Sequence, residues 1–279
     1  MSIGFIGLGN IGAPMACQLM KLGEELWVYD VAPAPVAELA RRGARAGAGV
    51  RDIAEHCRII GVCVRDEAEV SAVLNGDDGV FAHARPDAII AVHSTVTQAA
   101  ILQWAAHARE RGIHLLDAPI TGGASGAESA TLTYMVGGAS ELLERCRPVF
   151  LTSGQRIIHA GPVGTGILLK LCNNLMSYAA FAAADEAERL AAAGGLDRGL
   201  LAEVGRSNGV MTPQMEAFLK NRSQLAAAGR LRQAFAPFAG LARKDLAAAL
   251  ASARELRQVL PATERVAEII EQVFLNHNH

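Results

Sequence analysis

The sequence predicts an α/β protein of two domains, in which a parallel sheet covered by helices is followed by an all-helical part. Two observations lead to this prediction. The first half alternates short apolar or β-branched runs with Ala-rich or helix-like segments, which is typical of parallel strands buried on both faces. Beyond Gly164 the strand pattern stops and only helical segments follow. The 279 residues are also sufficient for two domains.

The expected elements follow this division in order along the chain. We expect strands at residues 3–6, 25–29, 59–64, 88–92, 113–116, 133–136 and 157–159. We expect helices at residues 164–193, 197–205, 211–228 and 238–275. Pro261 should break the last helix, because proline removes a backbone donor and clashes with the preceding turn. The predicted domains are therefore residues 1–162 and 163–279, and the terminal sequence LNHNH should be a frayed end rather than a metal site.

The composition excludes several classes of partner. A net charge of −2 gives no electrostatic reason to expect binding to nucleic acid or to an acidic membrane. No apolar run reaches the roughly 18 residues that span a bilayer, and no basic region precedes the first apolar stretch. The five cysteines are scattered, so we expect reduced thiols in the cytoplasm, neither disulfides nor a zinc site, and no metal.

A glycine-rich turn follows the first expected strand in the sequence GFIGLGNIG. Gly7 permits a tight turn, Gly9 lets the backbone approach a pyrophosphate, and Gly12 lets the next helix pack closely on the strand. Asn10 and Ile11 complete the loop, and the start of the helix offers free amides to phosphate groups. These features predict a dinucleotide site in a Rossmann domain, although a glycine triplet alone is a weak signal.

The second expected strand, ELWVYD, ends in Asp30, 18 positions after Gly12. A carboxylate at this place can bind the adenosine ribose hydroxyls and would repel a 2′-phosphate. Val31 and Ala32 follow, so no arginine is present to attract that phosphate. The sequence therefore favours NAD, with NADP as the alternative.

Two more loops follow strands whose carboxyl ends should face the same ligand. The first contains Val64 and Arg65, and the second contains Ser94 and Thr95. Ser94 and Thr95 could contact the cofactor or cap the helix that should start near Thr97, and these two roles are compatible.

The sequence DAPITGG contains a strand end, a proline and two glycines. Such a backbone can turn several amides toward one anion, for example a carboxylate, and Thr121 adds a hydroxyl beside Gly122 and Gly123. A plain glycine turn is the alternative.

Later in the chain, the apolar sequence LLKLCNNLMSYAA carries a polar stripe. Lys170, Asn173, Asn174 and Ser177 lie at i, i+3, i+4 and i+7, on one face of the expected helix. An exposed polar face is one interpretation, and a functional face within an apolar environment is the other.

Five motifs in this order resemble those of the β-hydroxyacid dehydrogenase family, which includes 3-hydroxyisobutyrate dehydrogenase and tartronate semialdehyde reductase. They are GFIGLGNIGAPMA, the STV at 94–96, DAPITGG, GTGILLKLCNN and the KDL at 244–246. The resemblance implies a long helix that joins the Rossmann domain to a helical substrate and oligomerisation domain, and a homodimer or homotetramer.

The resemblance also implies residue roles. Lys170 matches the family's catalytic lysine, and Asn174 matches the asparagine that orients the substrate. The turn that holds the substrate carboxylate in the family matches Thr121, Gly122 and Gly123. Lys244 matches a lysine that reaches the cofactor. Two positions depart from the usual pattern. Thr121 replaces serine and narrows the pocket, while Val64-Arg65 replaces leucine-proline, so only a backbone contact with the cofactor is expected there.

The predicted activity is hydride transfer between a nicotinamide cofactor and a small 3-hydroxy acid or its semialdehyde. The ammonium of Lys170 would donate a proton when an aldehyde is reduced, and the neutral amine would accept it in the opposite direction. Residues 207–215 and 235–238 should line the pocket. The alternatives are a reductase of a tartronate, succinic or sulfonated semialdehyde, an imine reductase, and a cofactor-binding protein without turnover. Lys170 argues against imine reduction, because imine reductases related to this family typically lack the lysine.

Overall fold

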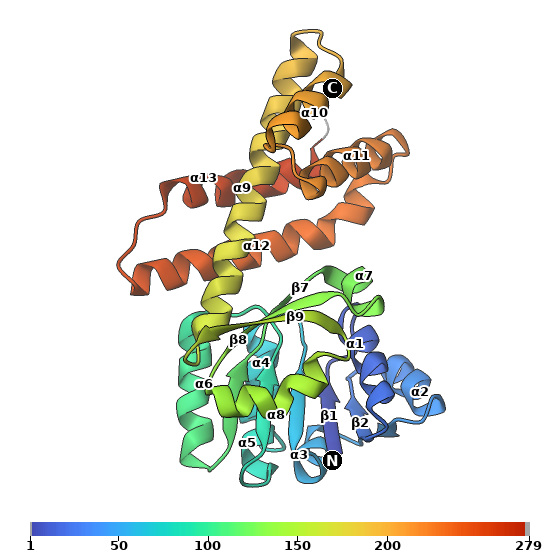
Figure 1. Cartoon of the computed structure of the whole chain (residues 1–279), viewed down its shortest axis with the longest axis vertical. Coiled ribbons are helices and arrows are strands. Elements are labelled where there is room, and N and C mark those ends of the chain that lie inside the picture. Colours follow the sequence, from blue (N-terminus) through green and yellow to red (C-terminus); the bar gives the residue numbers. More distant parts are fainter. Residues whose placement is uncertain (1, 277–279) are drawn as a thin grey trace. The chain divides into compact units, whose positions relative to one another are not determined.

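The computed structural model describes residues 2–276 of the chain (Figure 1). His277 and His279 of the terminal LNHNH sequence lie outside these residues. The chain divides into two compact units whose boundary lies between Lys170 and Leu171. The sequence-based boundary at 162/163 lies earlier, directly before the long helix α9 (Thr165–Ala193), which contributes residues to both units.

The first unit is built on a predominantly parallel sheet. In the described residues its order is β3-β2-β1-β4-β5-β6-β8-β7, with β9 beside β8. The strands β1 to β6 run parallel in their pairs, whereas β8 is antiparallel to β6 and to β7. Their bounds are β1 Ser2–Ile6, β2 Glu25–Tyr29, β3 Arg45–Ala46, β4 Ile59–Val62, β5 Ile89–Val92, β6 His114–Asp117, β7 Ile120–Thr121, β8 Leu132–Gly137 and β9 Gly154–Gly161.

Helices pack on both faces of this sheet, and each face has its own apolar core. One core includes side chains of α1, α2, α7 and α8, and the other includes side chains of α3, α4, α5 and α6. This arrangement confirms the predicted Rossmann fold class. The helices are α1 Gly12–Leu19, α2 Pro33–Arg41, α3 Val50–His56, α4 Glu67–Asn75, α5 Val80–His83, α6 Gln98–Glu110, α7 Gly123–Glu128 and α8 Ser140–Phe150, with a 3₁₀ turn at Met20–Leu22.

A buried histidine lies inside the first core. His93 follows β5, stacks on Phe5 with 5.9 Å between ring centroids, and contacts Tyr134 edge-on. Its Nδ1 lies 2.9 Å from the carbonyl oxygen of Ala118. Because a carbonyl can only accept, Nδ1 carries the proton. Burial lowers the pKa of His93 to about 4, so the imidazole is neutral at physiological pH.

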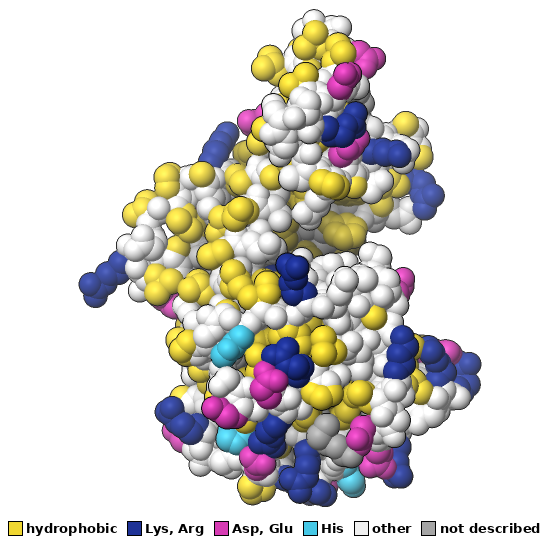
Figure 2. Space-filling view, in the orientation of Figure 1, with side chains coloured by type: hydrophobic (Ala, Val, Ile, Leu, Met, Phe, Trp, Pro, Cys, Tyr) yellow, Lys and Arg dark blue, Asp and Glu magenta, His cyan; other side chains and the backbone are white. Residues whose placement is uncertain are grey.

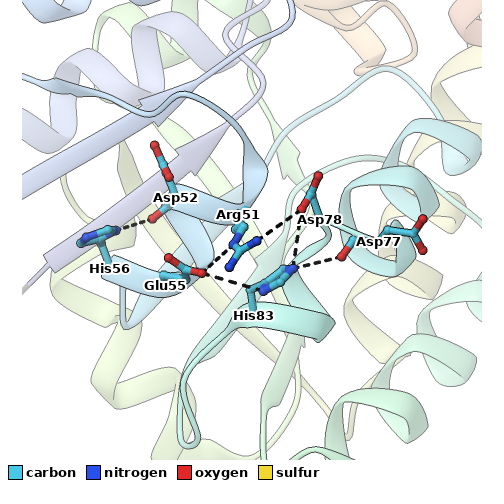
Figure 3. A network of polar contacts seen from close by, with 7 residues as sticks. All are labelled: Arg51, Asp52, Glu55, His56, Asp77, Asp78 and His83. Carbon is cyan, nitrogen blue, oxygen red and sulfur yellow. Dashed lines mark hydrogen bonds and ion pairs between the residues drawn. The ribbon is translucent and has the colours of Figure 1, made fainter.

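A network of charged side chains links α3 to the segment around α5 on the surface (Figure 3). Arg51 donates to Glu55 at 2.7 Å, and His83 lies 3.9 Å from Glu55 and 3.8 Å from Asp78. These groups are largely solvent-exposed, so the network adds little to stability. It connects neighbouring helices on one face of the sheet and does not involve the glycine loop.

The second unit contains the remaining part of α9 and four further helices. These are α10 Arg198–Asn208, α11 Pro213–Ala227, α12 Leu231–Glu255 and α13 Pro261–Leu275. Their apolar faces form one core, around residues such as Phe181, Phe218 and Phe274. Pro261 is the first residue of α13, as expected for a proline that ends one helix and starts another. The helix expected to begin at 238 begins at Leu231, and Pro237 lies inside it.

One charged cluster lies inside the helical unit. The guanidinium of Arg222 is fully buried, contacts Asp185, lies 3.2 Å from Glu188, and donates to the carbonyl of Val273 at 2.7 Å. By length and composition α9 is apolar enough to cross a membrane, although the sequence pattern predicted no such segment. Its carboxylates at Asp185 and Glu188 instead pair with a buried arginine, as in a core helix of a bundle.

Candidate functional site

The glycine loop between β1 and α1 has the geometry of a phosphate cradle. Gly7 has a φ of +95°, and a Cβ there would lie 2.3 Å from the carbonyl oxygen of Cys63. A Cβ at Gly12 would lie 2.0 Å from the Gly7 oxygen, so both positions require glycine. A Cβ at Gly9 would meet no atom within 4 Å, so the loop is open there. Asn10 and Ile11, both at the loop, lead into the first turn of α1, whose amides lack partners within the helix.

The Asp30 carboxylate is tied to this loop. Its Oδ2 accepts a hydrogen bond from the amide of Leu8 at 2.6 Å, and its Oδ1 accepts one from Ala32 at 2.7 Å. Each carboxylate oxygen keeps a further lone pair for a ribose hydroxyl. Val31, beside it, is 90% exposed. Hydrogen bonds therefore join the strand end to the glycine loop in one surface.

The loops after β4 and β5 are joined by Ser94. Its hydroxyl accepts from the amide of Val64 at 2.9 Å and donates to the Val64 carbonyl at 2.7 Å. Thr97, not Ser94 or Thr95, caps α6, since its side chain accepts from Ala100. The alternative of helix capping by Ser94 and Thr95 is therefore wrong.

The side chain of Arg65 does not reach toward the loop junction. Its guanidinium pairs with Glu69, and its backbone amide donates to the same carboxylate at 3.0 Å. The backbone amides of Val64 and Arg65 thus already have acceptors within the protein. The expected backbone contact of these residues with a cofactor stays a prediction.

The turn at Thr121 to Gly123 has backbone angles that favour glycine. Thr121 ends β7, Gly122 has a φ of +124° and Gly123 a φ of +63°. Both glycines are exposed, and a Cβ at Gly123 would meet nothing within 4 Å. Two successive positive φ angles turn the following amides of α7 away from the strand direction. The turn can therefore offer backbone donors to an anion in open space.

Asp117 connects this motif to the start of α9. Its carboxylate is fully buried and accepts from the amides of Gly164 and Ile167, each at 2.7 Å. Burial raises the pKa of Asp117 to about 6, although the backbone hydrogen bonds lower it. A carboxylate at a helix N-terminus is favourable, and it fixes the first turn of the helix that carries Lys170. This role of Asp117 was not predicted from the sequence.

A second carboxylate holds the asparagine of the polar stripe. The side-chain amide of Asn174 donates to Oδ2 of Asp245 at 2.8 Å, and the hydroxyl of Tyr178 donates to the same oxygen at 3.0 Å. The Lys244 ammonium lies 3.2 Å from the other oxygen, Oδ1. Asp245 and Asn174 are both buried. Burial, together with the Asp245 charge, raises the pKa of Tyr178, which keeps the hydroxyl a donor.

The hydrogen bond to Asp245 determines whether the nitrogen or the oxygen of the Asn174 side chain is available to a ligand. A carboxylate is acceptor-only, so the nitrogen of the Asn174 amide must face Asp245. The Asn174 oxygen then points elsewhere, and the side-chain amide of Asn173 approaches it at a long distance of 3.4 Å. The amide oxygen can accept a hydrogen bond from an alcohol. Asn174 is thus presented as an oriented acceptor.

Lys170 lies on the same helix, one turn before Asn174. Its side chain is half-buried, while Asn173 on the stripe is exposed and Ser177 donates to the Asn173 carbonyl at 3.1 Å. The polar stripe therefore divides into a solvent-facing part and a part held by Asp245. In residues 2–276 no group of three or more His, Cys, Asp or Glu side chains is placed to hold a metal ion.

Two family models together match nearly the whole chain. Residues 2–161 match the model described as the NAD binding domain of 6-phosphogluconate dehydrogenase. Residues 164–279 match the model described as the NAD-binding domain of NADP-dependent 3-hydroxyisobutyrate dehydrogenase.

Several relatives match most of this chain. An uncharacterised oxidoreductase of Mycobacterium tuberculosis is 38% identical, over 94% of this chain and 89% of its own. An NAD-dependent L-serine dehydrogenase of Pseudomonas aeruginosa is 40% identical, over 73% of this chain and 68% of its own. Among solved structures, 3-hydroxyisobutyrate dehydrogenase of M. tuberculosis with L-serine has a TM-score of 0.85 and 28% identity, covering 99% of this chain and 94% of that one.

Proposed function

Because the chain belongs to the β-hydroxyacid dehydrogenase family, we propose that it oxidises the primary alcohol of a small 3-hydroxy acid to the semialdehyde, reversibly, with Lys170 as general acid and base. At the coarser level the protein is an NAD(P)-dependent oxidoreductase that acts on CH–OH groups of hydroxy acids. The choice of substrate and the role of Lys170 belong to the proposal.

The residues of the glycine loop fit the cofactor. The open position at Gly9 leaves space for a pyrophosphate, and the Asp30 carboxylate is held beside the loop with lone pairs directed to a ribose. We propose NAD as the preferred cofactor, because Asp30 would repel a 2′-phosphate. When bound, the nicotinamide accepts the hydride that leaves C3 of the alcohol.

The observation that carries the proposal is the hydrogen bond between Asn174 and Asp245, one helical turn beyond Lys170. It leaves the Asn174 oxygen as an oriented acceptor at the site. The proton of the substrate hydroxyl passes to the neutral Nζ of Lys170 as the C–O bond becomes a carbonyl. In the opposite direction the Lys170 ammonium donates that proton and stabilises the developing alkoxide. Asp117 fixes the start of the helix that carries this pair.

The substrate carboxylate is assigned to the turn at Thr121, Gly122 and Gly123. The positive φ angles at both glycines and the open space at Gly123 support this assignment. Backbone amides would then hold the acid, and Thr121 would add one hydroxyl donor.

NADH formation from a panel of acids tests the proposal. The panel contains 3-hydroxyisobutyrate, L-serine, glycerate, 4-hydroxybutyrate and a sulfonate analogue, each with NAD and with NADP. We expect 3-hydroxy acids to be oxidised with NAD and the Lys170→Ala variant to be inactive with all of them. Absence of turnover with every acid, or equal turnover by the variant, would refute the proposed activity.

We also propose a homodimer or homotetramer in the cytoplasm. Large apolar side chains at one end of the helical unit are solvent-exposed, among them Leu190 (76%) and Val210 (67%). The described cysteines are all free thiols, as expected in a reducing compartment. Light scattering on the purified protein measures the assembly, and a monomer at micromolar concentration would refute it.

A further inference from the structure

One buried side chain joins the helix of the glycine loop to the helix that follows the turn at Thr121–Gly123. Gln18 lies on α1, six residues after Gly12, and is 7% exposed. Its side-chain nitrogen donates to the carbonyl oxygen of Glu128 at 2.6 Å and to that of Ala127 at 3.2 Å, both at the end of α7. The partners lie 110 and 109 residues away in the sequence, so this contact links the two motifs only in the folded chain.

The orientation of the Gln18 amide follows from its partners. A backbone carbonyl only accepts hydrogen bonds, so the amide nitrogen faces α7, with one hydrogen for each carbonyl. The amide oxygen Oε1 is buried and, among the described residues, has no donor within hydrogen-bonding distance. A buried acceptor without a partner is unfavourable, and an apolar side chain of the same length would not carry one. Donation to α7 is therefore what a glutamine supplies at this position.

The helix α7 depends on its neighbours for its position. It has six residues, and a helix of this length is not stable by itself. Ala130, directly beyond it, has a φ of +58°, which a residue other than glycine adopts only where the surroundings hold it. Ala127 belongs to the same apolar core as Met15 of α1, and α7 lies beside α1 (Figure 1). Packing on α1 and the two hydrogen bonds from Gln18 thus fix α7.

The turn that precedes α7 has only small groups with which to bind an anion. Residues 121–131 include no Lys, Arg or His, and Figure 2 shows the surface around α7 largely as backbone and uncharged polar side chains. An anion would therefore be held by backbone amides and by the Thr121 hydroxyl. Amides cannot follow a ligand as a long side chain can, so their position depends on where α7 lies. A misplacement of about 1 Å is sufficient to impair binding and orientation.

We propose that Gln18 is a positioning residue for the binding of the substrate carboxylate. Through α7 it sets the amides of the turn at Thr121–Gly123 relative to α1, the helix that begins at the glycine loop. The inference rests on the proposed function, because it requires this turn to bind the acid. Gln18 acts through the backbone of α7.

Gln18→Met keeps the length of the side chain and removes the donor. It should raise KM for an acid substrate about 3- to 10-fold, the effect expected from the loss of one or two hydrogen bonds. The value of kcat should change less than about twofold, because proton transfer at Lys170 is not altered. The affinity for NADH should also change less than about twofold, because the glycine loop keeps its own contacts.

Gln18→Asn provides a graded comparison. It keeps the amide but is one methylene shorter, so it should reach α7 less well and raise KM less than Gln18→Met does. Because Asn retains a donor, this variant also tests the inference if Gln18→Met does not fold. A KM for Gln18→Asn equal to that of wild type, with Gln18→Met unfolded, would show that the side chain serves only the stability of the fold and would overturn the inference.

Steady-state kinetics test these effects with the acid of the panel that wild type oxidises best and with its neutral amide analogue, at saturating NAD. The kcat/KM for the amide analogue should not change in Gln18→Met, because the carboxylate is absent. An unchanged KM for the acid, or an equal loss on acid and amide, would overturn the inference and leave the proposed function intact. Lack of oxidation of every acid by wild type would instead refute the proposed function.

Thr152→Val is the matched control. The Thr152 hydroxyl donates to the carbonyl of Val149 at 2.7 Å, in the last turn of α8. This variant also replaces a donor to a helix end by an apolar group of similar shape, but at a helix that does not carry the turn. Thr152→Val should leave KM for the acid unchanged. A rise in KM as large as that of Gln18→Met would show that any such loss in this unit has the same effect, and would overturn the assignment.

Hydrogen exchange tests the route through α7 without turnover. The amides of residues 123–131 should exchange faster in Gln18→Met than in wild type, because α7 opens more readily when its end is not held. Thr152→Val should not change the exchange of these amides. A rise in KM without faster exchange at residues 123–131 would overturn the role of α7.

A double variant tests whether Gln18 and the turn act together. Gly123→Val alters the turn directly, so Gln18→Met should raise KM less than about twofold further when it is added to Gly123→Val. Such non-additivity is expected only if both changes act on the same amides. If the effects of the two substitutions on KM multiply in full, Gln18 acts independently of the turn and the inference is wrong.

Discussion

The Asp245 carboxylate accepts the side-chain amide of Asn174 at 2.8 Å and thereby sets the orientation of that amide. The nitrogen of Asn174 is committed to the carboxylate, and the oxygen is left for a hydroxyl group. Tyr178 donates to the same carboxylate oxygen, so two donors of α9 hold the buried carboxylate of α12. A residue of the KDL segment thus controls a residue of the polar stripe.

We expect Asp245→Asn to lower kcat/KM by about 10- to 100-fold, because a hydrogen bond to a charged group is worth roughly 1.5–3 kcal/mol and Asn174 would lose its fixed orientation. Tyr178→Phe keeps the bond between Asn174 and Asp245 and should cost less than Asp245→Asn. Steady-state kinetics with 3-hydroxyisobutyrate measure both variants. Unchanged kinetics in Asp245→Asn would show that the carboxylate only stabilises the helices.

Lys170→Ala should reduce kcat by at least about a hundredfold, because acid–base participation is typically worth 10² to 10⁴ in rate. The affinity for the cofactor should stay near that of the wild type, which fluorescence titration with NADH measures. Lys220→Ala, at an exposed position of α11, removes the same charge elsewhere and serves as the control. Retention of more than a tenth of the activity by Lys170→Ala would refute the assignment.

Most of the fold could be predicted because its signals are local. The five central strands and the helix that follows Gly164 lie within two residues of their predicted bounds, since apolar runs mark buried parallel strands. β3 and β7 were missed, because two residues carry no periodicity. The start of α12 was placed seven residues late, because Pro237 lies inside this helix and proline normally marks a boundary.

The candidate site was predictable where chemistry is carried by a contiguous motif. Asp117 and Asp245 escaped because their partners are distant in the sequence: 47 residues separate Asp117 from Gly164, and 71 separate Asn174 from Asp245. In both cases the available signal was an acidic residue inside a recognised motif, Asp117 in DAPITGG and Asp245 in KDL.

Cofactor preference should depend on the end of β2. Asp30→Ser with Val31→Arg should raise the ratio of kcat/KM for NADP over NAD at least about tenfold, because the repelling carboxylate is removed and an exposed site gains a guanidinium. Val31→Arg alone is the control and should shift the ratio less. Initial rates with each cofactor give the ratio. A wild-type preference for NADP would contradict the role assigned to Asp30.

Stability should depend on pH through His93. Its pKa is lowered to about 4 by burial, below an unfolded value near 6.5. The unfolded chain therefore binds a proton that the folded chain does not, and stability falls as pH decreases from about 6.5 to about 4, by roughly 1.4 kcal/mol per pH unit. Asp117, with a pKa raised to about 6, acts in the opposite direction, because its protonation favours the folded state.

Denaturant unfolding of wild type and His93→Asn at pH 8 and pH 5 separates these effects. The variant keeps an N–H donor for the Ala118 carbonyl and has no titration, so its stability should lose less on acidification than that of the wild type. The difference between the two proteins isolates His93, because Asp117 is common to both. Parallel losses in the two proteins would show that the imidazole is protonated in the folded state.

Binding of the substrate carboxylate should depend on the backbone of the glycine turn at Thr121–Gly123. Gly123 has a φ of +63°, and a Cβ there would meet no atom within 4 Å. A side chain at this position is therefore unfavourable because of the positive φ and not because of a steric clash with another residue. The cost is greatest for a β-branched residue. Gly123→Val should shift the amides of the turn and raise KM for an acid substrate strongly, while cofactor binding stays intact. Thr121→Ser, which keeps the hydroxyl, should have a mild effect.

A matched control separates a local loss of anion binding from a general loss of stability. Gly112 is exposed, has a φ of +67° and likewise has no atom within 4 Å of a Cβ, but it lies in the loop before β6. Gly112→Val should introduce similar strain and leave KM unchanged. The second comparison uses a substrate analogue whose carboxylate is replaced by a neutral amide. Wild type should use this analogue poorly, and Gly123→Val should lose little more on it, because the interaction that the variant damages is absent. If wild type turns over acid and amide equally well, the turn does not bind the carboxylate, and the assignment of a hydroxy acid to this site loses its main structural support.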